Sequence, residues 1–319
     1  MPVAKLSHLT VRTAGVLLAV VSLLFVACAL GESDEPVPLG SDRKVLVVGI
    51  DGLRGDAVPV ADTPAMDALM AVGAFSLFAS TQLEAPTVSG PGWTSILTGV
   101  DSGKHLVVEN GGYGNRDERW PTMLRRAHDA GVPTATAIHW FPIQTSIIED
   151  SAVNEVTIGT DALVTQGMEQ MLEEGDYDLH FVHLDDVDAV GHRFGFDPEN
   201  AEYLEAVRVA DGYLSRLLAA IGSRATRAQE DWLIIVTSDH GGVGTSHGGA
   251  GAEHRAIPLI IAGDGVVAGE LTGASAVPGD LDVGFVSHLD VHPTVMRYLG
   301  LGPQADWQLD GVVRGLPSI

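Results

Sequence analysis

The sequence predicts an α/β fold in which a central, mostly parallel β-sheet is covered by helices on both faces. Short apolar runs rich in β-branched residues are continuous rather than alternating, as is typical of parallel strands buried on both faces. Amphipathic helical patterns lie between these runs. The composition agrees, because 45% of the 319 residues are hydrophobic, and 38 glycines and 16 prolines suit a loop-rich α/β domain.

Five apolar runs are predicted to form the strands. In chain order they span residues 44–50, 134–138, 178–184, 232–238 and 257–263. The helical patterns between them span residues 62–73, 122–131, 160–175 and 199–222. The first pattern has the clearest boundaries, with Thr63 as N-cap, Pro64 at the first helical position and Gly73 as terminator. The second ends in the same way at Gly131.

The formal net charge of −24 restricts the possible partners. Such an acidic chain lacks the basic stripes that bind nucleic acid, so no nucleic-acid polymer is expected as a partner. It also repels anionic substrates at long range. An anionic substrate would therefore need local positive charge, and a bound metal ion is the obvious source.

The N-terminus predicts export. Residues 1–27 have the charged start and short apolar stretch of an export signal. Cys28, the only cysteine, follows directly in a context that resembles the lipobox of bacterial lipoproteins, which predicts a lipid anchor on the membrane. The alternative is an uncleaved anchor over residues 14–30. Both interpretations place the protein at the cell envelope or the extracellular face. A single cysteine allows no intramolecular disulfide.

Residues 28–43 then read as a polar tether, and residues 44–319 as one catalytic domain.

Carboxylates and histidines follow three of the predicted strands. Ligands of such sheets bind beyond the carboxyl ends of the strands. The residues concerned are Asp51 after the first strand, Asp185, Asp186, Asp188 and His192 after the third, and Asp239, His240 and His247 after the fourth. The sequence therefore predicts one polar site at this edge of the sheet.

The spacing of these residues indicates a metal centre. Asp188 and His192 are four residues apart, so one helical turn would place them on one face. Mixed carboxylate and imidazole ligands are of the zinc type, whereas calcium and magnesium prefer oxygen. His247 is the natural remaining ligand, with His254 as its competitor. Asp185 and Asp186 could replace Asp188, but neither has its spacing to His192.

Each motif taken alone has an ordinary explanation. An isolated Asp-x-x-x-His pair is usually a solvated surface, and Asp239 with His240 could form only a tight turn. An aspartate after a strand is often a helix N-cap. Ser89, in the turn of residues 85–99, could likewise cap a helix or act as a nucleophile at its N-terminus.

Four motifs in this order resemble the alkaline phosphatase superfamily, and most closely its nucleotide pyrophosphatase/phosphodiesterase branch. They are VLVVGIDGLRGD (45–56), PTVSGPGWTSILTG (86–99), DVDAVGHRFG (186–195) and VTSDHGGVGTSHGG (236–249). The similarity runs from about Lys44 to Gly300. It implies an alkaline phosphatase-like fold with two zinc ions side by side at the strand ends.

The resemblance also implies roles for individual residues. One metal would be held by Asp188, His192 and His247, and the other by Asp51, Asp239, His240 and the hydroxyl of Ser89. Ser89 would be the nucleophile of a phosphoseryl intermediate, and Asn110 would contact the phosphoryl oxygen. Trp140 would line the leaving-group pocket. Residues 287–300 match the family's final helix, which is structural.

The expected substrate is a small phosphoester. Asn110 stands where phosphomonoesterases of the superfamily use a cationic side chain, and a neutral amide suits the single charge of a phosphodiester or pyrophosphate bond. Phosphomonoester and phosphonate hydrolysis are the alternatives within the superfamily. Trp93 replaces the arginine of the sulfatase signature, which argues against a sulfatase.

Two alternatives come from other classes of protein. One is a non-catalytic, exported binding lipoprotein, and intact ligand positions argue against it. The other is a metal-independent serine hydrolase, although the Gly-x-Ser-x-Gly elbow expected around its serine is missing at Ser89.

Other polar residues are expected to be structural. Five histidines in or beside apolar runs should be buried and hydrogen-bonded rather than ligands: His139, His180, His183, His288 and His292. Arg208 and Asp211 are expected on a solvated or paired face of their helix.

Overall fold

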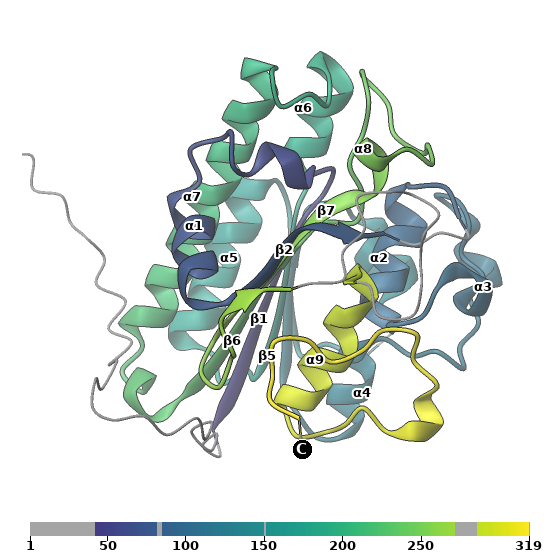
Figure 1. Cartoon of the computed structure of the whole chain (residues 1–319). Helices are drawn as coiled ribbons and strands as arrows, with labels where there is room; N and C mark the ends of the chain where they lie inside the picture. Colours follow the sequence, from purple (N-terminus) through teal and green to yellow (C-terminus); the bar gives the residue numbers. More distant parts are fainter. Residues whose placement is uncertain (1–41, 82–84, 150, 272–285, 319) are drawn as a thin grey trace, which may run out of the picture. The chain divides into compact units, whose positions relative to one another are not determined.

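The computed structural model describes residues 42–81, 85–149, 151–271 and 286–318, and an eight-stranded sheet lies at its centre (Figure 1). The strand order is β4-β3-β5-β1-β6-β7-β2-β8. The strands are β1 (Arg43–Ile50), β2 (Ala74–Ser80), β3 (Thr134–Ile138), β4 (Glu155–Ile158), β5 (Leu179–Leu184), β6 (Asp231–Thr237), β7 (Ala256–Gly263) and β8 (Gly269–Glu270). The five predicted strands and the α/β fold are confirmed. Strands β2, β4 and β8 were not predicted.

The centre of the sheet is parallel. Strand β1 pairs in parallel with β5 on one side and β6 on the other, whereas β7 is antiparallel to both β6 and β2. In register, Ile50 is opposite Leu184, and Gly49 is opposite Thr237. The chain therefore leaves β5, β1 and β6 at the same level of one edge, which brings together the segments that follow them.

Helices cover both faces of the sheet (Figure 1). They are α1 (Pro64–Val72), α2 (Ser89–Thr98), α3 (Ser102–His105), α4 (Met123–Asp129), α5 (Asp161–Glu174), α6 (Asp186–Phe194), α7 (Ala201–Ser223), α8 (Ala252–Arg255) and α9 (Val291–Tyr298). Alternate residues of β1 serve two hydrophobic cores, because successive side chains of a strand point to opposite faces. Leu46 and Val48 pack with α1, α5 and α7, and Val45 and Val47 pack with α2, α4 and α9.

Helix α1 begins at Pro64 with Thr63 in the N-cap position and is followed by Gly73, as predicted, but the Thr63 side chain makes no capping hydrogen bond. The Thr63 hydroxyl donates to the carbonyl of Val58 instead of capping the helix. The cap comes from a distant residue: the carboxylate of Asp211 on α7 accepts the backbone N–H groups of Ala65 and Met66, at 3.0 and 2.8 Å.

The expectation for Asp211 was therefore wrong in part. Asp211 is only 1% exposed and is bonded to the backbone of another helix, whereas Arg208 pairs with Glu205 on the surface as expected.

The prediction that five histidines are buried and structural is mostly confirmed. His180 and His292 are buried and donate from Nδ1 to the carbonyls of Val45 and Leu97. His288 is buried, but neither of its ring nitrogens has a hydrogen-bond partner among the described residues.

The predicted export signal, Cys28 and nearly all of the tether lie outside the described residues. Strand β1 begins at Arg43, the last residue of the predicted tether. Among the helices of the described ranges, none combines the length and the apolar character needed to span a bilayer.

Replacing Gly49 tests how tightly the sheet packs on α2, and replacing Gly212 in α7 is the control. A Cβ on Gly49 would lie 2.3 Å from Cη2 of the buried Trp93, whereas a Cβ on Gly212, in α7, would meet no atom within 4 Å. We expect Gly49→Ala to lower the free energy of unfolding by about 1–3 kcal/mol, because the indole has no room to move. Gly212→Ala should raise it by about 0.5–1 kcal/mol, because alanine is the better helix former. Urea unfolding of both variants measures the difference, and a neutral Gly49→Ala would contradict the packing described.

Candidate metal centre

The first group of ligand-type side chains joins α6 to the loop after β6. Asp188 and His192 lie one turn apart on α6, and His247 approaches from the loop. Nε2 of His192 is 3.3 Å from Oδ2 of Asp188 and 3.0 Å from Nε2 of His247. Nε2 of His247 is 3.8 Å from Oδ1 of Asp188. These three side chains could hold one metal ion.

The second group shares Asp188 with the first. Asp51, Asp188 and His240 place ligand atoms within 4.8 Å of one another. Nε2 of His240 lies 3.5 Å from Oδ1 of Asp51 and 3.3 Å from Oδ2 of Asp239. The structure thus brings all six predicted Asp and His ligands into one site at the carboxyl ends of β1, β5 and β6. His254, the competitor of His247, belongs to no such group among the described residues.

Ser89 is the first residue of α2 and faces this site. Val88 occupies the N-cap position and the helix has no side-chain cap, so the interpretation of Ser89 as an N-cap is wrong. Its Oγ lies 3.4 Å from Nε2 of His240. Asn110 is beside it, because its Oδ1 accepts the backbone N–H of Gly90 at 2.6 Å.

The three site histidines are held in the same tautomer by backbone carbonyls. Nδ1 of His192 lies 3.1 Å from the carbonyl of Thr245, and Nδ1 of His247 lies 3.0 Å from that of Thr87. His240 makes the same contact with Gly241, at 3.0 Å. A carbonyl can only accept, so each Nδ1 carries the proton and each Nε2 turns a lone pair into the site. The Nε2 atoms of His192 and His247 are 3.0 Å apart, so their lone pairs repel each other unless a cation or a proton lies between them.

The carboxylates also lack partners. Oδ1 of Asp51, Oδ1 of Asp188 and Oδ2 of Asp239 are buried with no hydrogen-bond partner among the described residues. Burial and the neighbouring Asp51 carboxylate raise the pKa of Asp188 to about 9 and that of Asp239 well above its usual range. Buried, unpaired carboxylates are expensive unless a cation neutralises them. The oxygen and imidazole donors present therefore fit divalent ions of the zinc type.

Comparison with known proteins agrees with this geometry. The family described as type I phosphodiesterase/nucleotide pyrophosphatase matches residues 45–259. The chain belongs to this family. It is thereby a member of the alkaline phosphatase superfamily, which confirms the resemblance seen in the sequence motifs.

Two human relatives and one bacterial structure illustrate the similarity. Ectonucleotide pyrophosphatase/phosphodiesterase family member 7 is 26% identical over 231 residues, covering 63% of this chain and 48% of the relative. The catalytic subunit of GPI ethanolamine phosphate transferase 2 is 27% identical over 280 residues, covering 83% of this chain and 27% of the relative. The chain thus spans about half the length of these relatives or less. The phosphonate monoester hydrolase of Agrobacterium radiobacter has the same fold, with a TM-score of 0.62 at 16% identity over 85% of this chain and 76% of that one.

In this member of the family, Trp93 and His183 orient Asp51. Oδ2 of Asp51 accepts Nε1–H of Trp93 at 2.8 Å and lies 3.1 Å from Nε2 of His183. Nδ1 of His183 accepts the backbone N–H of Trp140, so the proton of His183 is on Nε2 and is donated to Asp51. Although burial alone would raise it, the hydrogen bond from His183 holds the pKa of Asp51 well below its usual range. Oδ2 is thus occupied, and Oδ1 is left to face the site.

Sequence reasoning placed His183 correctly as a buried, hydrogen-bonded residue but missed the role of Trp93. The signal was present, because Trp93 is four residues after Ser89 and so lies on the same face of α2. Trp140, expected at the leaving-group pocket, is half-buried beside His183, and its contact with a leaving group stays a prediction.

Two further Asp and His groups do not resemble the metal centre. In the group of Asp51, His183 and Asp185, the Asp51 oxygen is already bonded to His183 and Trp93. In the group of His139, Asp161 and Asp186, both oxygens of Asp161 accept backbone N–H groups. Hydrogen bonds therefore already occupy the Asp51 and Asp161 oxygens of these two groups.

The metal-free protein should lose stability as the pH rises. The pKa of Asp188 is near 9 in the folded protein and 3.8 when unperturbed, so its contribution to stability is fully present below about pH 4 and is lost progressively as the pH rises toward 9. The pKa of His240 is lowered to about 3, which makes the stability rise with pH instead. This rise is complete by about pH 7.

We therefore expect the free energy of unfolding in chelator to fall by roughly 1–3 kcal/mol per pH unit between about pH 7 and 9. Asp188→Asn should flatten this slope, because it keeps the neutral form at every pH. Urea unfolding across the pH series measures both, and a stability that rises over this window would contradict the burial of the carboxylates.

Proposed function

We propose that the chain is a metal-dependent phosphoric ester hydrolase that acts through a phosphoseryl intermediate on Ser89 and favours phosphodiester or pyrophosphate bonds. The observation that carries this proposal is the convergence of three imidazole lone pairs and three unpartnered carboxylate oxygens beside one serine hydroxyl. Membership of the type I phosphodiesterase family supports the same reaction class.

Two ions, most simply Zn²⁺, fit the donor set. Asp188, His192 and His247 would hold one of them. Asp51, Asp239, His240 and Ser89 would hold the other. When bound, the pair would supply the positive charge and Lewis acidity that phosphoryl transfer needs.

The chain's own residues supply the nucleophile and its surroundings. Ser89 Oγ, once deprotonated, would form a bond to phosphorus as the ester oxygen leaves, and water would then cleave that bond and restore the hydroxyl. Ser89 opens a helix of ten residues, and the N-terminus of a helix favours an anion. Asn110 uses its Oδ1 on Gly90, which leaves its amide N–H groups to bond a phosphoryl oxygen.

We also propose that residues 1–27 direct export and that Cys28, or an uncleaved anchor, attaches the enzyme to a membrane. The substrate would then be a small phosphoester met at the cell envelope or outside the cell. This proposal rests on the residue pattern of the N-terminus.

Replacing the nucleophile tests the chemistry. We expect Ser89→Ala to lower kcat toward an aryl phosphodiester by at least about 10³-fold with the zinc content little changed, because the other ligands remain. Ser95→Ala is the matched control, since Ser95 is a buried serine of the same helix whose Oγ contacts His105 instead of the site. It should stay within about threefold of the wild type. Equal activity of Ser89→Ala and Ser95→Ala would exclude a phosphoseryl intermediate.

Paired substrates test the specificity. We expect kcat/KM for bis(p-nitrophenyl) phosphate to exceed that for p-nitrophenyl phosphate by about tenfold or more, because Asn110 carries no charge. A chelator should abolish both activities, and metal analysis should find about two zinc ions per chain. A preference for the monoester would overturn the diester assignment alone. A chain that binds no zinc would instead support the non-catalytic lipoprotein, and activity that resists the chelator would support a metal-independent hydrolase.

A further inference from the structure

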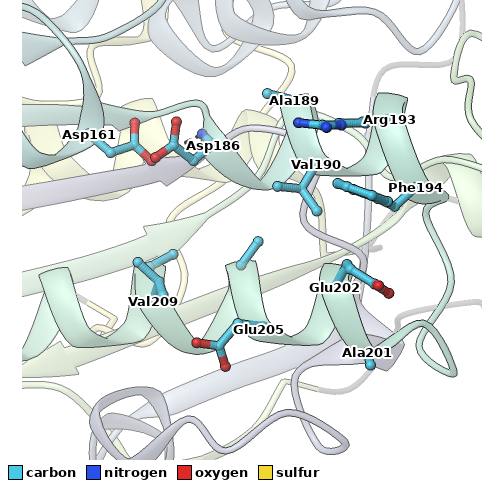
Figure 2. A pocket seen from close by; sticks show the side chains of 12 residues that line it. Asp161, Asp186, Ala189, Val190, Arg193, Phe194, Ala201, Glu202, Glu205 and Val209 are labelled. Atoms are coloured by element: carbon cyan, nitrogen blue, oxygen red, sulfur yellow. Dashed lines mark hydrogen bonds between the residues drawn. The ribbon is translucent and has the colours of Figure 1, made fainter.

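Helix α6 carries two of the six Asp and His ligands, yet little of it is packed. Of its nine residues only Val187, Asp188 and Gly191 are buried. A groove of about 700 Å³ separates its outer face from α7 (Figure 2). Val190, Arg193 and Phe194 line this groove, and Phe194 is 44% exposed. This face of α6 is therefore incompletely packed against α7, so contacts elsewhere along the helix contribute to holding its ligands in place.

One such contact lies at the first turn of α6. Asp185 occupies the N-cap position, but its side chain makes no capping bond. Asp161, the first residue of α5, supplies the cap from outside. Its Oδ1 accepts the backbone N–H of Asp185 at 2.8 Å, and its Oδ2 accepts that of Asp186 at 3.0 Å. Figure 2 shows Asp161 and Asp186 together at one end of the groove.

Asp161 is itself firmly held. It is fully buried, and α5 is anchored in the core through Val164, Met168 and Leu172. Nδ1 of His139, at the end of β3, lies 2.7 Å from Oδ1 of Asp161. This hydrogen bond raises the pKa of His139. Three segments that follow β3, β4 and β5 thus meet at a single side chain.

We propose that Asp161 is a positioning residue of the metal centre, which fixes the first turn of α6 and thereby places the ligand atoms of Asp188 and His192. Asp188 is only two residues after Asp186, so a loosened first turn displaces its carboxylate directly. His192 follows one turn later. This inference rests on the proposed metal site, and it assigns Asp161 no contact with metal or substrate.

The chain contains a matched control for this proposal. Asp211 is 1% exposed and accepts two successive backbone N–H groups at the start of α1, at 3.0 and 2.8 Å, just as Asp161 does for α6. Helix α1 carries no residue of the site. The same substitution at both positions therefore removes the same kind of cap, once from the ligand-bearing helix and once from a helix that bears none.

The experiment compares Asp161→Asn with Asp211→Asn in the full-length chain. Asparagine keeps the size of the side chain but has one acceptor oxygen, so one N–H of each helix loses its partner. Urea unfolding of the metal-free proteins should show losses of similar size. Zinc titration against a competing chelator should show a dissociation constant raised about 10–100-fold in Asp161→Asn and unchanged within about twofold in Asp211→Asn. At saturating zinc, kcat of Asp161→Asn should return to within a few-fold of the wild type, because the ligand set is intact.

Equal zinc affinities of the two variants would overturn the proposal, as would a kcat of Asp161→Asn that excess zinc does not restore. Asp161→Ala, which removes both acceptors, should shift the affinity further in the same direction, and a smaller shift than that of Asp161→Asn would also count against it. The zinc titration needs no substrate, so the two failures are distinguishable. A wild type that binds no zinc refutes the proposed metal site. A wild type that binds zinc with the same affinity as Asp161→Asn refutes only the positioning role.

Discussion

The repulsion among three buried carboxylates is the constraint on which the rest of this structure depends. Asp51, Asp188 and Asp239 meet in one space at the carboxyl ends of the central strands, and each leaves one buried oxygen without a partner in the described part of the chain. The second oxygen of two of these carboxylates does have a partner. Oδ2 of Asp51 accepts the indole N–H of Trp93, and Oδ1 of Asp239 accepts the backbone N–H of Gly52. This grouping is compatible with a stable core only if a cation binds to the carboxylates or if protons neutralise them.

The backbone prepares the other half of the ligand set. Each site histidine gives its Nδ1–H to a carbonyl, which orients the ring before any ion binds. Thr87 joins this arrangement to the proposed nucleophile, because its carbonyl accepts a hydrogen bond from His247 while its hydroxyl donates to the carbonyl of Gly249 at 2.9 Å and accepts the N–H of Gly248 at 3.1 Å. Thr87 is two residues before Ser89, so these bonds tie the loop after β6 to the segment that carries Ser89.

The sequence predicts the site better than it predicts the supports of the site. Continuous apolar runs reveal β1, β5 and β6, and polar residues at their ends follow from the parallel pairing. Strand β2 is missed because Ser76 and Ser80 interrupt its apolar character and Phe78 is exposed at 42%. The caps that Asp161 and Asp211 provide to other helices join residues 24 and 146 positions apart, and no local pattern encodes such a pair. The partner of the Trp93 indole, Asp51, also lies 42 residues away, and the four-residue spacing to Ser89 indicates only which face of α2 carries Trp93.

Charge balance at the proposed centre explains why an acidic chain could prefer a diester. The carboxylates of Asp51, Asp188 and Asp239 contribute three negative charges, and the lone pairs of the histidines contribute none. Two divalent ions would bring four positive charges, which leaves one in excess while Ser89 is protonated and none once it is deprotonated. A phosphodiester would then add one negative charge to this space, whereas a doubly charged monoester would add two where Asn110 offers only a dipole. The side-chain hydrogen bond of Ser89 in the described part of the chain is to His240 rather than to a lysine or arginine, so neutralising a monoester would fall mainly on the ions.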